Sequence, residues 1–258
     1  HQMMVGDSIT SRDVRNIRSK RWRLILSSQT ILQETMGSGG LAAAIGHLTQ
    51  VSQNLGFPFF AYGVKCPLPI SQPRIEMTSN YPEAWQQQYQ SHHYVQIDPT
   101  VRHCTRAPTP VLWDAAAFDE RVFGEQAMAH GIRNGVSIGV RDAQGRLGMV
   151  TLARDQTLCT PDEFAHIEGS LALLGQLTHA ALVERLTQRS SQPGPALSER
   201  ELEVLKWTAE GKTSGEVAMI MNITERTVNF HISNCIVKLD ASNKLHAAVK
   251  AAMSGLLG

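Results

Sequence analysis

Residues 197–239 have the sequence LSERELEVLKWTAEGKTSGEVAMIMNITERTVNFHISNCIVKL, and this stretch decides how the C-terminal part of the chain folds. Ser198 and Glu201 have the spacing of a capping box, and a second box follows at Thr213 and Glu216. A capping box starts a helix because its two side chains bind backbone N–H groups of the first turn. Short helices with brief connections pack tightly, which is typical of a helix-turn-helix module.

The third helical pattern of this stretch separates an apolar stripe from a polar face. The stripe has helical spacing and consists of Val228, Ile232, Cys235, Ile236 and Leu239. The opposite side holds Arg226 and Ser233, with Thr227 and Asn229 on its flanks. Arg, Asn and Ser side chains can read base edges in the major groove of DNA. Phosphate contacts that fix the orientation are expected from Lys212, Lys238 and Lys244.

Charge does not decide whether DNA or protein is the partner of this module. The whole chain has a formal net charge of +1, and residues 196–258 contain seven Lys/Arg and seven Asp/Glu. A protein that coats DNA through phosphate contacts is far more basic. Helical periodicity is equally compatible with a small bundle that binds another protein, so both interpretations stay open at this point.

The detailed pattern of the same stretch resembles the LuxR-type helix-turn-helix. The shared parts are L-[ST]-x-R-E-x-E-V-L, G-K-[ST]-x-x-E-[IV]-A and T-V-x-F-H, which match at Leu197, Arg200, Glu201, Glu203, Gly211, Lys212, Glu216, Thr227, Val228 and His231. A match in several separate parts is highly specific. The resemblance implies a transcription regulator that binds double-stranded promoter DNA.

The region before this module mixes helical and strand patterns. LAAAIGHLTQVSQNLG predicts an amphipathic helix that ends at Gly56, and FPFFAYGV predicts a strand. VSIGVRDAQGRLGMVTLAR predicts two strands joined by a turn, and residues 161–188 predict a long helix. Helices and strands in this order predict an α+β domain, in which helices pack against a largely antiparallel sheet.

An aromatic cluster stands out within this region, in SNYPEAWQQQYQSHHYVQIDPTV. Tyr81, Trp85 and Tyr89 recur every four residues, which stacks them along one side of a helix whose first turn suits Pro82. Asp98 follows in an Asp-Pro turn and supplies an acceptor. Aromatic faces with a few polar groups are typical of a small-molecule pocket. The same spacing is more often plain protein core, and an aspartate in this context also caps turns.

The block NYPEAWQQQY…IDPTVRHCTRAPTPVLW resembles the ligand-binding domain of acyl-homoserine lactone receptors, the quorum-sensing branch of the LuxR family. With LGFPFFAYGVKCPLP before it, the resemblance covers nearly all of residues 40–258. It implies that Tyr81 donates to the acyl carbonyl, Trp85 donates to the lactone carbonyl, and Asp98 accepts the ligand's amide N–H. It further implies that Trp113 packs near the lactone ring. The remaining implied pocket residues are Thr151, Ser137, Tyr89, Ala61 and Met77.

The two resemblances together imply a fold, a domain order and a function. The fold is α+β: an N-terminal α/β/α sandwich with an antiparallel sheet, followed by a four-helix helix-turn-helix domain. Its expected parts are an N-terminal extension at 1–26, a lactone-binding domain at 27–188, a linker at 189–196 and the DNA-binding domain at 197–258. The extension carries the basic run RDVRNIRSKRWR and is longer than the family usually shows.

The implied function is that of a cytoplasmic regulator that acts as a homodimer and is not an enzyme. No cofactor or metal is expected, because the four cysteines are scattered without a CxxC pair. No apolar run is long enough to cross a membrane. Two alternatives stay open: an enzyme that acts on the lactone, although an HxHxDH motif is absent, and a ligand-independent dimerisation module or sensor of another small molecule.

Overall fold

The computed structural model describes residues 41–187 and 196–257. The basic N-terminal extension and nearly all of the expected linker lie outside these ranges. The described residues divide into two compact units. One unit contains residues 41–64, 76–140 and 148–186, and the other contains residue 187, residues 196–257 and the loops 65–75 and 141–147.

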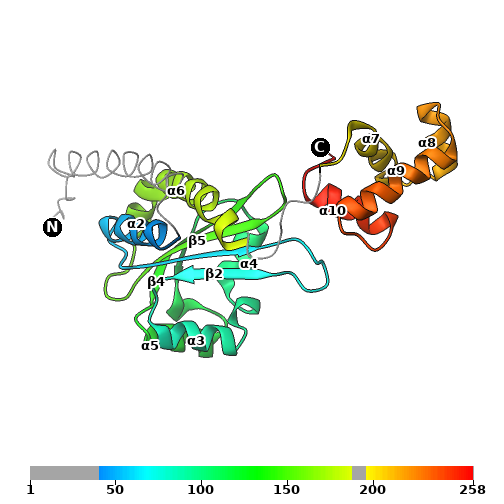
Figure 1. The fold of residues 1–258 in the computed structure, drawn as a ribbon. Helices are drawn as coiled ribbons and strands as arrows, with labels where there is room; N and C mark the ends of the chain where they lie inside the picture. Colours follow the sequence, from blue (N-terminus) through cyan, green and yellow to red (C-terminus); the bar gives the residue numbers. More distant parts are fainter. Residues whose placement is uncertain (1–40, 188–195, 258) are drawn as a thin grey trace, which may run out of the picture. The chain divides into compact units, whose positions relative to one another are not determined.

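An antiparallel five-stranded sheet with helices on both faces forms the first part of the described chain (Figure 1). The strand order is β2-β1-β5-β4-β3, and β3 pairs antiparallel with β4. None of the helices in the described ranges is long and apolar enough to cross a membrane. In chain order the elements are α2 (Leu41–Asn54), β1 (Phe59–Lys65), β2 (Ile75–Ser79), α3 (Glu83–Ser91), η1 (Tyr94–Gln96), α4 (Pro99–Arg106), β3 (Val111–Asp114), η2 (Ala115–Ala117), α5 (Arg121–Ala129), β4 (Asn134–Arg141), β5 (Leu147–Arg154) and α6 (Pro161–Thr187).

The helices, strands and hairpin expected from periodicity are confirmed, and local signals explain where they end. Gly56 follows α2 with a φ of +85°, a left-handed conformation that glycine adopts without strain. In the turn between β4 and β5, Asp142 accepts hydrogen bonds from the backbone N–H groups of Gln144 and Arg146. Gly145 supplies the positive φ of this turn, at +71°. Such local hydrogen bonds favour the hairpin over longer connections.

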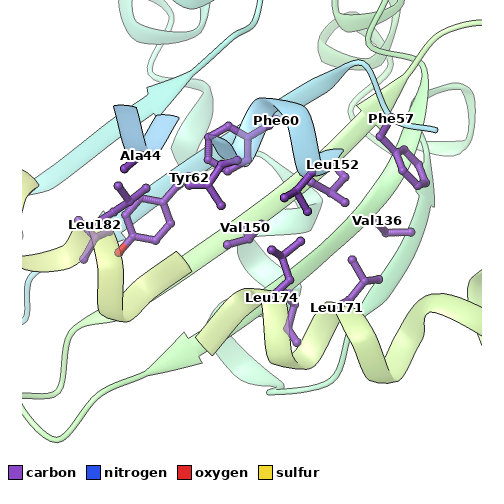
Figure 2. Close-up of a cluster of buried hydrophobic side chains, with 14 of the residues drawn as sticks. Ala44, Phe57, Phe60, Tyr62, Val136, Val150, Leu152, Leu171, Leu174 and Leu182 are labelled. Atoms are coloured by element: carbon purple, nitrogen blue, oxygen red, sulfur yellow. The ribbon is translucent and has the colours of Figure 1, made fainter. Parts of the chain in front are cut away.

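Helices α2 and α6 pack on one face of the sheet and enclose the main apolar core. Alternate residues of the central strands point into this core, because side chains along a strand alternate between the two faces. Figure 2 shows how leucines of α6 meet the side chains of these strands. The labelled core residues are Ala44, Phe57, Phe60, Tyr62, Val136, Val150, Leu152, Leu171, Leu174 and Leu182.

Four helices follow at the C-terminus, and we call them the helical unit. They are α7 (Glu199–Ala209), α8 (Ser214–Met221), α9 (Glu225–Lys238) and α10 (Lys244–Met253). Both predicted capping boxes are present, with Ser198 and Glu201 starting α7 and Thr213 and Glu216 starting α8. Asn222 ends α8 in a left-handed conformation with a φ of 54°.

Helix α9 lies at the centre of the helical unit and contacts α7, α8 and α10. The predicted apolar stripe of α9 is confirmed. Val228, Ile232 and Cys235 are buried, and Ile236 and Leu239 pack against the same cores. Because this stripe faces the other helices, the opposite side of α9 is left to solvent.

A buried ion pair fastens the end of α9 to the start of α7. The Glu201 side chain is only 5% exposed, and its Oε2 accepts hydrogen bonds from Lys238 Nζ and from the backbone N–H of Ser198, both at 2.7 Å. Lys238 Nζ also donates to the carbonyl oxygen of Ala196 at 3.1 Å. Burial by itself would raise the pKa of Glu201, but the bonds from Lys238 and Ser198 outweigh it and lower the pKa below 4.5.

Replacing Lys238 should therefore weaken the helical unit. Lys238→Met leaves the Glu201 carboxylate buried without a cation, and we expect the free energy of unfolding to fall by about 2 kcal/mol. Hydrogen exchange of the α9 amides, measured by mass spectrometry on the full chain, reports this unit separately. Because the pKa of Glu201 is lowered by folding, its contribution is complete above about pH 4.3 and is lost as the pH falls through the folded pKa.

The matched control is Lys206→Met on α7, where the lysine is exposed. We expect this variant to exchange like the parent protein at neutral pH. The difference between Lys238→Met and the parent should shrink as Glu201 becomes protonated. Equal α9 protection in the two variants at neutral pH would contradict the stabilising role of the ion pair.

Candidate functional site

An aromatic cluster covers the second face of the sheet, where α3 and α5 lie (Figure 1). The buried aromatic residues of this cluster are Trp85, Tyr89, Tyr94, Trp113 and Phe123. Trp85 and Tyr89 lie one turn apart on α3, with ring centroids 5.8 Å apart. Tyr81 packs against the same cluster. Four predicted pocket residues, Tyr81, Trp85, Tyr89 and Trp113, are thus brought together by α3, β3 and the segment that precedes α3.

Tyr81 precedes α3 and does not belong to it. Pro82 is the N-cap residue with a ψ of 135°, so the helix begins at Glu83, just after the position expected for the proline. The ring of Tyr81 lies 5.8 Å from the ring of Phe59, centroid to centroid. Burial and the charge of Asp98 raise the pKa of Tyr81 well above 10.0. The Tyr81 hydroxyl therefore stays protonated and can donate a hydrogen bond.

Asp98 has two roles in the structure. As the N-cap of α4, its Oδ1 accepts hydrogen bonds from the Thr100 N–H at 2.8 Å and the Thr100 hydroxyl at 2.6 Å. Its Oδ2 accepts a hydrogen bond from the Tyr89 hydroxyl at 2.9 Å. Burial raises the pKa of Asp98 above 3.8, although the bonds from Thr100 and Tyr89 act against this rise. A carboxylate has about four acceptor sites, so Asp98 can cap α4 and still accept one N–H from a ligand.

A line of hydrogen-bonded side chains starts at Trp113 of the aromatic cluster and crosses the neighbouring strands. Trp113 Nε1 donates to Ser137 Oγ at 3.0 Å, and Ser137 Oγ lies 2.9 Å from Thr151 Oγ1. Trp113 on β3 pairs with Gly135 on β4. A Cβ atom at Gly135 would lie only 2.6 Å from the Trp113 ring. The absence of a side chain at Gly135 thus gives Trp113 the space to reach Ser137.

Ala61 and Met77 lie on the same face of the sheet but differ in burial. Ala61 is 8% exposed, and alternation along β1 places it opposite the core residues Phe60 and Tyr62. Met77 on the edge strand β2 is 42% exposed. Its Cγ lies 3.6 Å from where a Cβ of Gly63 would be, two residues beyond Ala61. Ala61 is therefore a buried residue of the sheet face that is opposite the main apolar core, and Met77 is an exposed residue of the same face.

Some members of the site were not predicted from the sequence. Phe123 on α5 lies 5.8 Å from Trp85 between ring centroids, and the Tyr94 hydroxyl donates to the Gln126 side chain. The available signal for α5 was the spacing of Phe123 and Ala127, which are both buried and four residues apart. No local pattern shows that this helix packs against α3.

The chemistry of these groups is suited to binding. Cys104 lies near Asp98, but burial and the Asp98 charge raise the pKa of its thiol to about 12. A thiol with so high a pKa is a poor nucleophile at neutral pH. Within residues 41–187 and 196–257, no group of three or more His, Cys, Asp or Glu side chains could hold a metal ion.

In the helical unit, the solvent-facing side of α9 carries the predicted base-reading residues. Arg226, Asn229 and Ser233 are all exposed, and Arg226 lies in the first turn of the helix. Asn229 Oδ1 accepts a hydrogen bond from the Ser214 hydroxyl of α8 at 2.8 Å. Thr227 differs from these residues because it helps to cap α9: its N–H donates to Thr224 Oγ1 at 3.1 Å.

The three predicted phosphate-contacting lysines have different surroundings. Lys212 lies in the connection before α8, and Lys244 is the exposed first residue of α10. Neither lysine side chain forms a hydrogen bond or ion pair with another residue of the described ranges. Lys238 is engaged within the helical unit by Glu201 and Ala196.

Comparisons with known proteins match both parts of the chain. Residues 40–182 match the family described as autoinducer binding domain, and residues 195–251 match the bacterial regulatory proteins of the luxR family. The chain is 41% identical over 210 residues to the transcriptional activator protein AnoR of Acinetobacter nosocomialis, which covers 80% of this chain and 88% of AnoR. It is 36% identical over 206 residues to the HTH-type quorum-sensing regulator RhlR of Pseudomonas aeruginosa, with coverage of 80% and 86%.

Solved structures give the same result. A crystal structure of Escherichia coli SdiA matches with a TM-score of 0.77 and 31% identity over 93% of this chain and 98% of SdiA. A structure of SdiA in complex with octanoyl-rac-glycerol matches with a TM-score of 0.76 and 31% identity over 89% and 95% of the two chains. These families consist of transcriptional regulators and not of enzymes. The chain belongs to the LuxR family of autoinducer-binding, DNA-binding transcriptional regulators.

Proposed function

We propose that this regulator is a cytoplasmic quorum-sensing receptor, which binds an N-acyl-homoserine lactone and acts on promoters as a homodimer. The observation that carries the proposal is the aromatic cluster with Asp98 joined to it through Tyr89. The cluster supplies apolar surface for a ligand, and the groups around it supply hydrogen-bond donors and one acceptor. This is the composition expected of a pocket that binds an amphipathic small molecule.

The polar groups match the ligand in kind. Among the described residues, the Trp85 indole N–H and the Tyr81 hydroxyl donate to no other protein group. Each can therefore donate to an acceptor that a ligand brings. A lactone carbonyl would pair with Trp85, and an acyl carbonyl would pair with Tyr81. Asp98 would accept the amide N–H between them, and Trp113 would pack near the lactone ring.

An acyl chain is supported by the apolar surroundings and by one relative. The cluster is extended by half-buried apolar residues such as Phe59, Phe118 and Met128. SdiA, which is 31% identical to this chain, has been solved in complex with octanoyl-rac-glycerol. That molecule has an acyl chain but no lactone, so an acylglycerol is the second candidate ligand.

The proposed switch operates by mass action. A ligand that binds only the folded α/β unit stabilises that unit by RT ln(1 + c/Kd), where c is the ligand concentration, so the stability rises with the concentration and affinity of the ligand. Two paired helical units would then place their α9 helices in successive major grooves, about one turn of DNA apart. The exposed residues Arg226, Asn229 and Ser233 would read base edges there, and Lys212 and Lys244 would contact phosphates.

The ligand can be identified by mass spectrometry of purified protein expressed in a mixture of N-acyl-homoserine lactones and octanoyl-glycerol. We expect retention of one lactone per protomer. Retention of octanoyl-glycerol with exclusion of every lactone would overturn the lactone assignment and leave the pocket assignment standing. Retention of neither class would overturn both.

Two substitutions test the polar contacts of the pocket. Trp85→Phe removes the indole N–H but keeps an aromatic ring. Asp98→Asn keeps the cap of α4, since asparagine is a good N-cap residue, but places a donor where the ligand's N–H requires an acceptor. We expect each variant to lose about tenfold or more in affinity for N-octanoyl-homoserine lactone. Isothermal titration gives the affinities.

Asp114→Asn is the matched control, because Asp114 also caps a helical turn through its side chain but does so at η2. We expect this variant to bind the lactone like the parent protein. Unchanged affinity in both Trp85→Phe and Asp98→Asn would remove the proposed pocket.

The proposed DNA interface predicts two kinds of loss in DNA-binding affinity. Arg226→Ala should weaken binding to a duplex selected in vitro by about 1–3 kcal/mol, with little effect on a scrambled duplex, because a base contact is lost. Lys212→Ala should weaken binding to both duplexes alike and lower the slope of log affinity against log salt by about 1, because a phosphate contact is lost. Fluorescence anisotropy at several salt concentrations measures both quantities.

Lys206→Ala on α7 serves as the control for loss of one positive charge, and we expect it to bind both duplexes like the parent protein. An equal loss on both duplexes for Arg226→Ala would show that Arg226 contacts the backbone and not the bases.

A further inference from the structure

Three buried polar side chains from neighbouring strands form a continuous hydrogen-bonded line. Trp113 belongs to β3, Ser137 to β4 and Thr151 to β5, and their exposed fractions are 9%, 1% and 7%. The two distances along the line are 3.0 Å from Trp113 Nε1 to Ser137 Oγ and 2.9 Å from Ser137 Oγ to Thr151 Oγ1. We call this line the relay.

The number of hydrogens in the relay leaves one donor unused. An indole N–H donates only, so Ser137 Oγ must accept from Trp113. The relay then has one more bond to make, and either Ser137 donates to Thr151 or Thr151 donates to Ser137. Of the three donor hydrogens, two are used in the two bonds, and one hydroxyl hydrogen remains on Ser137 or on Thr151.

Burial decides which hydroxyl keeps the spare hydrogen. Ser137 is almost completely enclosed, and within the described part of the chain its hydroxyl has no partner besides Trp113 and Thr151. A spare hydrogen there would be buried without an acceptor, which is costly. Donation from Trp113 also polarises the Ser137 hydroxyl and makes it a better donor to Thr151. The favoured arrangement therefore runs from Trp113 to Ser137 to Thr151.

We propose that Ser137 is a positioning residue, which fixes the Thr151 hydroxyl as a hydrogen-bond donor to a carbonyl oxygen of the ligand. Ser137 then acts through Thr151 and does not touch the ligand. The inference rests on the proposed function, because it takes the ligand to lie against the face of β5 that carries Thr151. It adds a rule of selectivity: the ligand group at Thr151 must be an acceptor.

The relay explains two features of its surroundings. Gly135 on β4 gives the Trp113 ring the room it needs to reach Ser137. Ala153 on β5, two residues beyond Thr151, is fully buried against the aromatic cluster. Because residues two positions apart on a strand share a face, Thr151 faces the cluster too. Thr151 therefore lies on the cluster side of the sheet, where Trp85 and Tyr81 also bring unused donors.

The experiment compares N-octanoyl-homoserine lactone with its thioamide analogue, because a thiocarbonyl sulfur is a poorer acceptor than a carbonyl oxygen. Titration of the full-length protein gives the preference for the amide as a ratio of dissociation constants. The variants are Ser137→Ala, Thr151→Val, the double variant and Ser137→Thr. The last variant keeps a hydroxyl at position 137 and serves as the conservative control. Melting temperatures of the unliganded proteins monitor folding.

We expect the parent protein to prefer the amide by about tenfold, and Ser137→Ala and Thr151→Val each to reduce this preference by about fivefold. The double variant should lose no more than either single variant, because both act on the same hydrogen bond. Ser137→Thr should keep the preference. A merely structural role for Ser137 would weaken both ligands equally and leave the ratio unchanged, and that result would overturn the proposal.

Trp113→Phe gives a second test if Ser137→Ala does not fold. Without the indole N–H, the Ser137 hydroxyl is less polarised and holds the Thr151 hydroxyl less firmly, so the preference for the amide should fall, but by less than in Ser137→Ala. An unchanged preference in Trp113→Phe would overturn the relay from Trp113 to Thr151. Failure of the parent protein to bind either ligand would instead contradict the lactone assignment, so the two failures are distinguishable.

Discussion

The two-residue period of the central strands is the constraint on which the ligand site depends. On β4, Val136 and Ile138 enter the core beneath α2 and α6, and Ser137 between them must face the aromatic cluster. The same alternation sends Leu152 on β5 into the core and Thr151 to the cluster. A shift of one residue in either strand would bury hydroxyls among leucines and expose valines, so the packing of the core also fixes the polar groups of the site.

Two glycines on β4 leave the space that the neighbouring groups of the site need. Gly135 admits the ring of Trp113, and Gly139 lies so close to the carbonyl of Cys104 on α4 that any side chain would strike it. Helix α4 is thereby held against β4, and Asp98 at its N-terminus is held with it. The room for the Trp113 ring and the close approach of α4 thus both depend on the absence of side chains at two positions of one strand.

The sequence predicts the parts of this molecule that local rules determine. Capping boxes, the turn at Asp142 and the i, i+4 spacing of Trp85 and Tyr89 involve residues close together in the chain. The relay joins residues 24 and 14 positions apart, and its geometry depends on strand register. The ion pair between Glu201 and Lys238 spans 37 positions, which explains why the local pattern suggested only a phosphate contact for Lys238.

Unused donors link the energetics of the free protein to those of the complex. The Trp85 indole N–H and the Tyr81 hydroxyl donate to no described protein group, and the proposed direction of the relay leaves the Thr151 hydroxyl able to donate as well. A ligand with acceptors in the right places pairs these donors and adds the burial of its own acyl chain. Because a ligand makes these contacts only with the folded α/β unit, the stability of that unit rises with the concentration and affinity of the ligand. A pocket that paired its own donors would offer fewer hydrogen bonds to a ligand, and it would respond less to the concentration of its signal.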